Sequence, residues 1–303
     1  MADRGAQPHG WLILDKPRGL GSTQAVGAVK RNLREARYGK VKVGHGGTLD
    51  PLAEGVLPIA LGEATKLAGR MLDASKIYEF TVAFGAETTT LDTQGEVTRQ
   101  SAHRPAMAQI QAILPRFTGP IEQIPPAYSA LKVEGRRAYD LARDGCEVAL
   151  AARKVEVFAL EFVSSSSEGN SSTLRAHVSK GTYIRSLARD IARALGSVGH
   201  VTYLRRVKAG PFREDQAISL DILNEIGKGA PLQHHILPLE AGLDDIPALL
   251  LDPTSAQAVR QGRVLSGLPH ADGLHFAKLG QVPVALMEIA DGTATVVRGF
   301  NLS

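Results

Sequence analysis

The chain has 303 residues, of which 44% are hydrophobic and 22% are charged, with a formal net charge of +4. This length and composition predict a globular protein with one large domain or two unequal ones. A single cysteine, Cys146, excludes an internal disulfide framework and any multi-cysteine metal site. No apolar run is long enough to cross a bilayer, and residues 1–10 lack the apolar stretch of a signal peptide, so we expect a cytoplasmic protein without membrane contact.

The basic residues are unevenly distributed along the chain. Between positions 30 and 42 six basic residues accompany one acid, and between 175 and 213 nine accompany one acid. From position 238 onward the balance reverses, with four basic and seven acidic residues. Two basic blocks far apart in sequence predict one positive surface assembled by the fold, which suits nucleic acid. Scattered solvated charges are the alternative, and it is most credible for residues 30–42 taken alone.

The first half of the chain alternates strands and helices. Residues 10–15 form a compact apolar run that predicts a buried strand, and Ser22-Thr23 offers the N-cap of a helix that follows. Alternation from Tyr78 to Phe84 predicts a half-buried strand over residues 76–84. The other elements expected up to position 208 are helices at 63–72, 107–117 and 182–195, strands at 155–163, 174–179 and 201–208, an extended segment at 124–132 and a surface loop at 164–172.

From about residue 245 the pattern of predicted elements changes. Asp252 is the expected N-cap of a short helix at 253–261, with Pro253 at its first position. Short strands punctuated by glycines follow it. These elements predict a mixed α+β body over residues 1–244 and a small β-rich appendage over residues 245–303.

The densest group of unusual residues is Gly44-His45-Gly46-Gly47-Thr48-Leu49-Asp50-Pro51. The glycines permit positive φ and close approach of a ligand, and Pro51 keeps Asp50 out of the α region. A carboxylate held this way between apolar residues is a candidate for catalysis. The alternative is a simple turn in which Asp50 bonds its own backbone.

A second stretch, Lys180-Gly181-Thr182-Tyr183-Ile184-Arg185-Ser186, joins a predicted strand to a predicted helix. Backbone N–H groups at a helix start favour anions, and Arg185 can pair with a carboxylate or a phosphate. Tyr183 as a core residue and Arg185 as a surface ion are the alternative. By periodicity alone, Tyr78 and Leu204 are core residues and Arg205 is a solvated charge.

Taken together, four separated motifs resemble the TruB family of tRNA pseudouridine synthases: residues 44–57, 76–80, 180–186 and 203–206. The family often carries Thr or Ala after the motif histidine, where this chain has Gly46. The resemblance extends from Trp11 to about Phe212. It implies a catalytic domain built on a mainly antiparallel sheet, followed by a small RNA-binding appendage like the PUA domain.

The resemblance also implies roles for the catalytic candidates. The nucleophilic aspartate of the family falls on Asp50, and Arg185 pairs with it and keeps it ionised. Tyr183 contacts the target base. Tyr78 stacks on that base and is a candidate acceptor of the proton at carbon 5, although the sequence does not decide between the two tyrosines.

For substrate binding, the resemblance assigns His45 to an RNA contact that fills the gap left by the extruded base. Leu204 forms an apolar wall of the uracil pocket, and Arg205 points towards the phosphates. Lys16 is an RNA contact or a structural residue. Asp92 also fits a family position, or is only a turn residue.

The implied reaction isomerises the uridine at tRNA position 55, in the TΨC loop, to pseudouridine. It needs no redox cofactor, nucleotide or metal, in agreement with the lack of a P-loop, a dinucleotide fingerprint and zinc spacing in the sequence. The partner is the T-arm of tRNA, which we expect a monomer to bind. Extruding the base costs a few kcal/mol.

Three other functions stay open at this stage. A non-catalytic RNA-binding protein would need the basic surface and the aromatic residues but not Asp50. A carboxylate hydrolase would need an acid paired with Asp50, for which Glu54 is the sequence-local candidate. A guide-RNA-dependent pseudouridine synthase would need protein partners for its guide.

Overall fold

A computed structural model describes residues 7–302 except 130, 134 and 145–149, so Cys146 lies outside the described residues. The body of the protein is a ten-stranded sheet in the order β14-β1-β3-β12-β4-β11-β10-β7, with β13 beside β12 and β2 beside β3. Its strands are β1 (Gly10–Lys16), β2 (Val43–His45), β3 (Glu54–Leu61), β4 (Lys76–Phe84), β7 (Gly119–Gln123), β10 (Arg153–Ser165), β11 (Ser171–Val178), β12 (Gly199–Ala209), β13 (Phe212–Arg213) and β14 (Ile236–Leu237). Paired strands run antiparallel, apart from β12 and β3, which are parallel. The predicted mixed α+β fold is confirmed.

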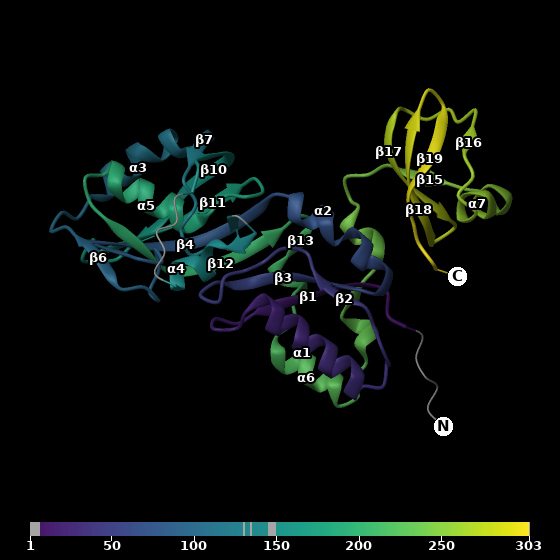
Figure 1. The fold of residues 1–303 in the computed structure, drawn as a ribbon, viewed down its shortest axis with the longest axis horizontal. Helices are drawn as coiled ribbons and strands as arrows, with labels where there is room; N and C mark the ends of the chain where they lie inside the picture. The colour runs from purple at the N-terminus through teal and green to yellow at the C-terminus, as the bar shows by residue number, and fades with distance from the viewer. Residues whose placement is uncertain (1–6, 130, 134, 145–149, 303) are drawn as a thin grey trace.

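Helices cover the two halves of this sheet (Figure 1). Helices α1 (Ser22–Glu35) and α6 (Leu220–Gly227) lie by the β1–β3 half, and α3 (Met107–Ile113) and α5 (Ile184–Ala194) lie by the β4–β10 half. No helix of the described residues is long and apolar enough to cross a membrane. The shorter elements are β5 (Ala86–Thr88), β6 (Val97–Gln100), β8 (Lys132–Val133), β9 (Arg136–Arg137), α2 (Ala68–Asp73), α4 (Ala138–Arg143), η1 (Gly62–Leu67), η2 (Leu114–Phe117), η3 (Glu214–Gln216), η4 (Leu232–His234) and η5 (Leu239–Gly242).

Two expected boundaries differ from the structure. The surface loop predicted at 164–172 shrinks, because β10 continues to Ser165 and β11 already begins at Ser171. The hydroxyls of Ser165 and Ser172 bond each other across the two strands at 2.7 Å. The serines here therefore extend the pairing of β10 with β11 and do not end it. Ser22-Thr23 does not cap α1; the N-cap is Gly21, and the Ser22 hydroxyl is engaged elsewhere.

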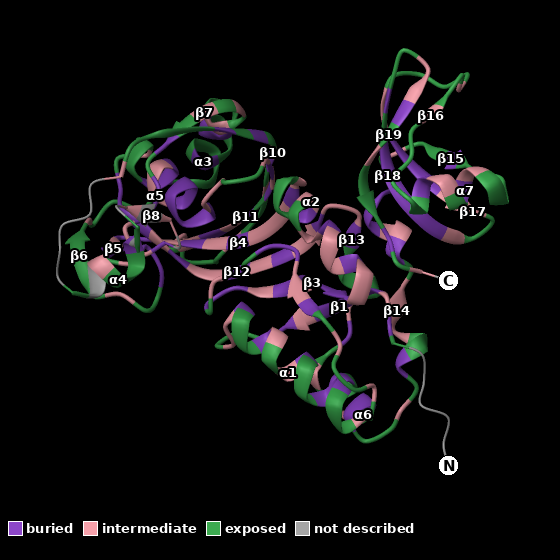
Figure 2. Ribbon diagram, turned by 45° about the vertical axis from the view of Figure 1, so that its right-hand side comes forward, coloured by how far each residue is buried: buried purple, intermediate pink, exposed green. Residues whose placement is uncertain are grey.

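Strand alternation sends β1 into two different cores. Leu12 and Leu14 face the core beneath α1 and α5, whereas Trp11 and Ile13 face a second core on the opposite side of the sheet. All four side chains are at most 1% exposed. Figure 2 shows the buried residues running along the central strands and the inner side of α5. This doubly covered sheet is the rigid support for the loops that follow.

The C-terminal residues form a separate five-stranded sheet, at the yellow end of the chain in Figure 1. Its order is β15-β17-β18-β19-β16, and its helix α7 is capped by Asp252, which accepts from Thr254 N and Ser255 N as predicted. We propose a domain boundary between residues 244 and 245, just before this sheet begins. The elements are β15 (Ala248–Leu250), α7 (Pro253–Arg260), β16 (Leu265–Ser266), β17 (Gly273–Leu279), β18 (Val282–Ala290) and β19 (Thr293–Gly299).

This small sheet is docked on the body through apolar and polar contacts. Phe276 and Phe300 belong to the same buried cluster as Trp11. Around them, Lys66 Nζ donates to Gly299 O at 2.8 Å, Asn301 N donates to Glu63 Oε2 at 2.8 Å, and Arg70 pairs with Asp245 at 3.0 Å. The appendage therefore completes a core of the body rather than hanging on a free linker.

Candidate active site

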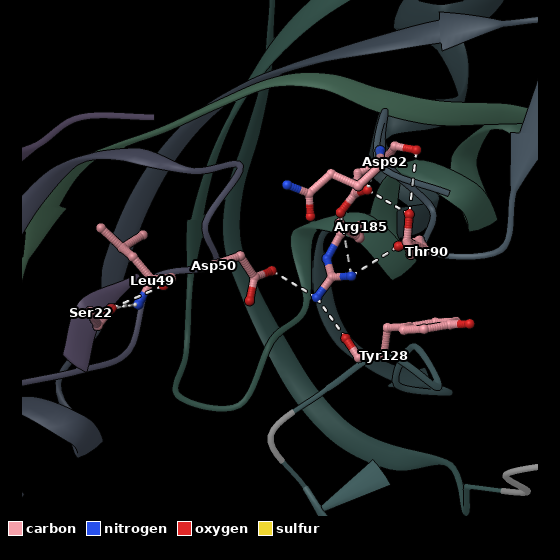
Figure 3. A network of polar contacts seen from close by, with 8 residues as sticks. Ser22, Leu49, Asp50, Thr90, Asp92, Tyr128 and Arg185 are labelled. Atoms are coloured by element: carbon pink, nitrogen blue, oxygen red, sulfur yellow. Dashed lines mark hydrogen bonds and ion pairs between the residues drawn. The ribbon is translucent and has the colours of Figure 1, made fainter. Parts of the chain in front are cut away.

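The loop that carries Asp50 connects β2 to β3 and is clamped by α1. The Ser22 hydroxyl accepts from Leu49 N at 2.8 Å and donates to Leu49 O at 2.9 Å (Figure 3). One buried side chain thus fixes both backbone polar groups of Leu49, the residue before Asp50. Beyond Asp50, Gly19 N donates to Pro51 O at 2.7 Å. The Asp50 side chain remains 38% exposed. A fixed backbone thus presents a carboxylate that a ligand can reach.

Arg206, a buried residue to which the sequence assigned no role, binds the backbone of the same loop. Arg206 is 1% exposed, and its guanidinium donates to Val56 O at 2.7 Å, Gly47 O at 3.1 Å and Thr48 O at 3.4 Å. Gly55 must be glycine here, because its φ is +97° and a Cβ would lie 2.4 Å from Arg206 O. Adjacent arginines on a strand point to opposite faces, and sequence alone does not say which of Arg205 and Arg206 points inward.

Arg185 pairs with Asp50, as the resemblance implies. Its Nη2 lies 2.7 Å from Asp50 Oδ2, and it also donates to Thr90 O at 2.9 Å and Tyr128 O at 3.0 Å. Figure 3 shows the guanidinium lying between Asp50 on one side and Asp92, Thr90 and Tyr128 on the other. The Arg185 side chain is 5% exposed, so its guanidinium is already held in position and orientation before any substrate binds.

Asp92 is more than a turn residue. Its carboxylate lies 3.5 Å from Arg185 Nη1, accepts from Gln94 N at 2.9 Å and accepts from the Thr90 hydroxyl. At 4% side-chain exposure it is a buried counter-charge for the arginine. The single sequence signal for it was its place in the family pattern.

Tyr78, Tyr183 and Leu204 meet around Asp50. They line a pocket of about 110 Å³ together with Asp50 and Arg185, and they come from β4, from the residue before α5 and from β12. Burial raises the pKa of the Tyr183 hydroxyl above its ordinary value. A second cavity, of about 300 Å³, shares Asp50 and both tyrosines with this pocket. Motifs that lie between residues 44 and 206 of the sequence thus converge on one aspartate.

His45 lies at the end of β2, half-buried, and lines neither of these two cavities. Its Nδ1 accepts from Gly47 N at 3.4 Å, and burial, with a further contribution from Arg206, lowers its pKa. A Cβ on Gly46 would lie 2.6 Å from Met71 Cβ. Packing of Met71 against the loop thus explains glycine where the family often has Thr or Ala.

Two expected substrate contacts, Lys16 and Arg205, are bound to other groups of the protein. Lys16 has no exposed surface, and its ammonium donates to Pro17 O at 3.1 Å and Leu20 O at 2.7 Å, which makes it a structural residue. Burial lowers its pKa to about 8. The Arg205 side chain is 22% exposed, and its guanidinium contacts the carboxylates of Asp15, Glu214 and Glu54 at 3.1, 2.9 and 3.5 Å. A phosphate would therefore have to compete with these three acids.

The basic blocks also differ from expectation. In block 175–213 most basic residues already form ion pairs with acids of the protein. The paired residues are Arg175, Lys180, Arg185, Arg189, Arg193 and Arg205. Arg206 is buried and donates to backbone carbonyls. In block 30–42 all six basic side chains are exposed, and none forms an ion pair with a described residue. Block 30–42 therefore offers more unpaired exposed charge than block 175–213, in which Lys208 and Arg213 also have no ion pair among the described residues.

The described residues contain no group of three or more His, Cys, Asp or Glu side chains that could hold a metal ion. The ionisable side chains that line the pocket are instead the carboxylate of Asp50, the phenols of Tyr78 and Tyr183, and the guanidinium of Arg185, which is fixed by its own neighbours. This set can stabilise charge, stack on a planar base and transfer protons.

Comparison with known proteins places this site in a family. Residues 32–184 match the TruB family pseudouridylate synthase N-terminal domain, and residues 185–244 match the tRNA pseudouridylate synthase B C-terminal domain. The chain is 68% identical to tRNA pseudouridine synthase B of Novosphingobium aromaticivorans, over 97% of each chain. It is 56% identical to the Zymomonas mobilis protein of the same name, over 97% of this chain and 96% of that one.

Solved structures give the same fold. A chain in the structure of an H/ACA RNP bound to a substrate RNA containing 2'-deoxyuridine superposes with a TM-score of 0.73 at 25% identity, covering 96% of this chain and 85% of that one. A chain of a Cbf5-Nop10-Gar1 complex gives 0.69 at 25% identity, covering 100% and 90%. With both family models matched and two relatives that are 68% and 56% identical over 97% of its length, this chain belongs to the TruB family of pseudouridylate synthases.

Proposed function

We propose that the protein acts as a monomer on the T-arm of tRNA and isomerises the uridine at position 55 to pseudouridine. The observation that carries the proposal is the Asp50–Arg185 pair at 2.7 Å, set in a pocket whose walls are Tyr78, Tyr183 and Leu204. The relatives named tRNA pseudouridine synthase B support tRNA as the substrate.

In this proposal the target base leaves the RNA stack and enters the 110 Å³ pocket, where an aromatic ring returns about 1–3 kcal/mol of stacking. The bond between N1 of uracil and C1′ of ribose breaks, the base turns, and a bond from C5 to C1′ forms. The C5 proton leaves and N1 gains a proton, so the product is an isomer of the substrate.

The side chains divide this work. Arg185 pairs with Asp50 and keeps the carboxylate aimed at the nucleotide, so that it can act as nucleophile or base. Leu204 and the tyrosine rings keep the detached uracil in a water-poor pocket. The Tyr183 hydroxyl, whose pKa is raised by burial, can donate a hydrogen bond to the base. Tyr78 lines the same pocket, and both tyrosines remain candidates for the acceptor of the C5 proton.

The competing functions fit the geometry less well. A hydrolase with Glu54 as the partner acid is disfavoured, because Glu54 contacts Arg205 whereas Asp50 contacts Arg185. A purely RNA-binding protein would have no need of an aspartate that is paired with Arg185 and carried on a loop fixed by Ser22 and Arg206. Guide-dependent action is disfavoured by 25% identity to H/ACA chains against 68% to a relative named as a tRNA enzyme.

The proposal is tested with short RNA hairpins carrying [5-³H]uridine, because the reaction releases the C5 hydrogen to water. We expect tritium release from a T-arm stem-loop and none from an anticodon stem-loop of the same length. Replacing the uridine that corresponds to position 55 with cytidine should abolish release. Equal release from both hairpins would overturn the T-arm assignment.

Salt dependence of tRNA binding tests where the electrostatic contacts lie. Lys40 and Lys42 are exposed, unpaired among the described residues and lead directly into the strand of His45. Each phosphate contact contributes about 0.9 to the slope of log affinity against log salt. We expect Lys40→Ala/Lys42→Ala to reduce that slope by roughly 1–2.

The matched control is Arg175→Gln/Arg193→Gln, which removes the same charge from residues already paired with Glu79 and Glu87. This control should leave the slope nearly unchanged. The opposite pattern would move the RNA contact to the second basic block.

Truncation tests the role of the appendage. A fragment of residues 1–244 keeps Asp50, Tyr78, Tyr183, Arg185 and Leu204, so we expect near-normal single-turnover chemistry with weaker tRNA binding. It loses Phe276 and Phe300 from the core around Trp11, and each buried side chain of this kind contributes about 1.5–3 kcal/mol. The melting temperature should therefore fall.

The truncation assay must run below the melting temperature of the fragment. A folded fragment that binds tRNA normally but has lost its single-turnover rate would show that the appendage takes part in chemistry.

A further inference from the structure

A second cavity lies against the base pocket and shares its reactive walls. The smaller pocket, about 110 Å³, and the larger one, about 300 Å³, both include Asp50, Tyr78 and Tyr183. Arg185 and Leu204 line only the smaller pocket, whereas Lys76 and Arg206 line only the larger one. Asp50 thus stands at the junction of two spaces with different chemistry.

The two basic residues that line only the larger cavity, Lys76 and Arg206, have no acidic partner among the described residues. Lys76, the first residue of β4, is 7% exposed, and its Nζ donates to Leu72 O at 2.7 Å and Ala74 O at 2.5 Å. Arg206 donates only to carbonyls. Among the described residues, neither has a carboxylate within ion-pair distance, and the nearby Asp73 is bound to Lys180 at 2.9 Å.

This contrasts with the other side of Asp50. There the buried Arg185 is balanced by Asp50 and Asp92. A buried charge without a partner is costly, and a ligand that brings the opposite charge removes that cost. Burial, with Arg206 next, lowers the pKa of Lys76 to about 8, so its ammonium form still predominates at neutral pH and a bound anion would stabilise it further.

We propose that the larger cavity binds the ribose-phosphate backbone of the target nucleotide, with Lys76 contacting a phosphate that flanks the flipped uridine. The inference rests on the proposed function. A uracil in the smaller pocket places its C1′ beside Asp50, and the sugar and phosphate must then extend away from the base. The larger cavity lies in that position and supplies the matching charge. The third N–H of the Lys76 ammonium remains for the phosphate, since two are used by carbonyls.

The test combines a protein change with an RNA change. Lys76→Met is compared with the wild type on a T-arm stem-loop in which one phosphate, either 5′ or 3′ of the target uridine, is replaced by an uncharged methylphosphonate. For one of the two positions we expect the wild type to lose about tenfold in affinity. Lys76→Met should bind the unmodified RNA about tenfold more weakly and lose less than twofold on the same replacement.

The control variant is Lys228→Met, which removes an exposed lysine paired with Glu225 at 2.8 Å. It should keep the full methylphosphonate penalty of the wild type. If Lys76→Met melts at a lower temperature, Lys76→Arg provides the second variant, because it keeps the charge and should restore both the affinity and the penalty.

A methylphosphonate penalty that is equal in the wild type and in Lys76→Met at both positions would overturn the assignment. Failure of the proposed function would look different, because the wild type would then release no tritium from the unmodified stem-loop.

Discussion

Asp50→Asn should abolish pseudouridine formation and leave affinity for the T-arm within a few-fold of the wild type. Asparagine keeps the shape of the side chain but cannot act as an anionic nucleophile or base. Removing such a group lowers rates by about 10⁴-fold or more in other enzymes. Single-turnover tritium release with enzyme in excess measures the chemistry, and filter binding measures the affinity.

Binding should survive because little else moves. Leu49 remains clamped by Ser22, and Arg185 keeps its bonds to Thr90 O and Tyr128 O and its pair with Asp92. Glu54→Gln is the matched control, since it neutralises the neighbouring acid that contacts Arg205 instead. Product from an Asp50→Asn preparation free of host enzyme would sink the assignment of Asp50.

Arg185→Met is expected to damage both stability and catalysis. It leaves the carboxylate of Asp92, which is 4% exposed, without its cation, and breaking a buried pair in this way costs about 3–5 kcal/mol. Asp50 loses the charge that orients it, so the single-turnover rate should fall by roughly 10²–10³-fold. Urea unfolding and tritium release measure the two effects.

A second change separates the causes. In Arg185→Met/Asp92→Asn the stranded buried charge is gone, so the double variant should be more stable than Arg185→Met alone. Catalysis should not recover, because Asp50 still lacks its partner. Identical unfolding curves for the wild type and Arg185→Met would show that the pair is not structurally important.

The sequence predicted which side chains lie together around Asp50 better than it predicted the contacts that surround them. Asp50, Tyr78, Tyr183, Arg185 and Leu204 each lie in a short motif whose order along the chain matches the family, and the sheet order brings those motifs together. Periodicity alone predicts Tyr78 and Leu204 to be core residues. Both side chains do pack in the hydrophobic core, but they also line the pocket beside Asp50. Their role depends on the neighbouring strands, and a linear pattern does not contain that information.

The parts that could not be predicted concern where charges point. Arg205 and Arg206 are neighbours in sequence, yet Arg205 binds three acids at the surface and Arg206 is buried under the loop that carries Asp50. Lys16 looks like a surface cation in sequence, but the carbonyls of Pro17 and Leu20 turn it inward. Block 175–213 holds nine basic residues and one acid in sequence, but Glu79, Asp73 and Glu87 from distant segments pair with three of its basic residues.

The most direct measurement is to incubate the purified protein with a full-length unmodified tRNA transcript and map pseudouridine at nucleotide resolution. Our account predicts one pseudouridine, at position 55, with the wild type and none with Asp50→Asn. Absence of pseudouridine from the wild-type reaction, or its appearance only at other positions, would contradict it.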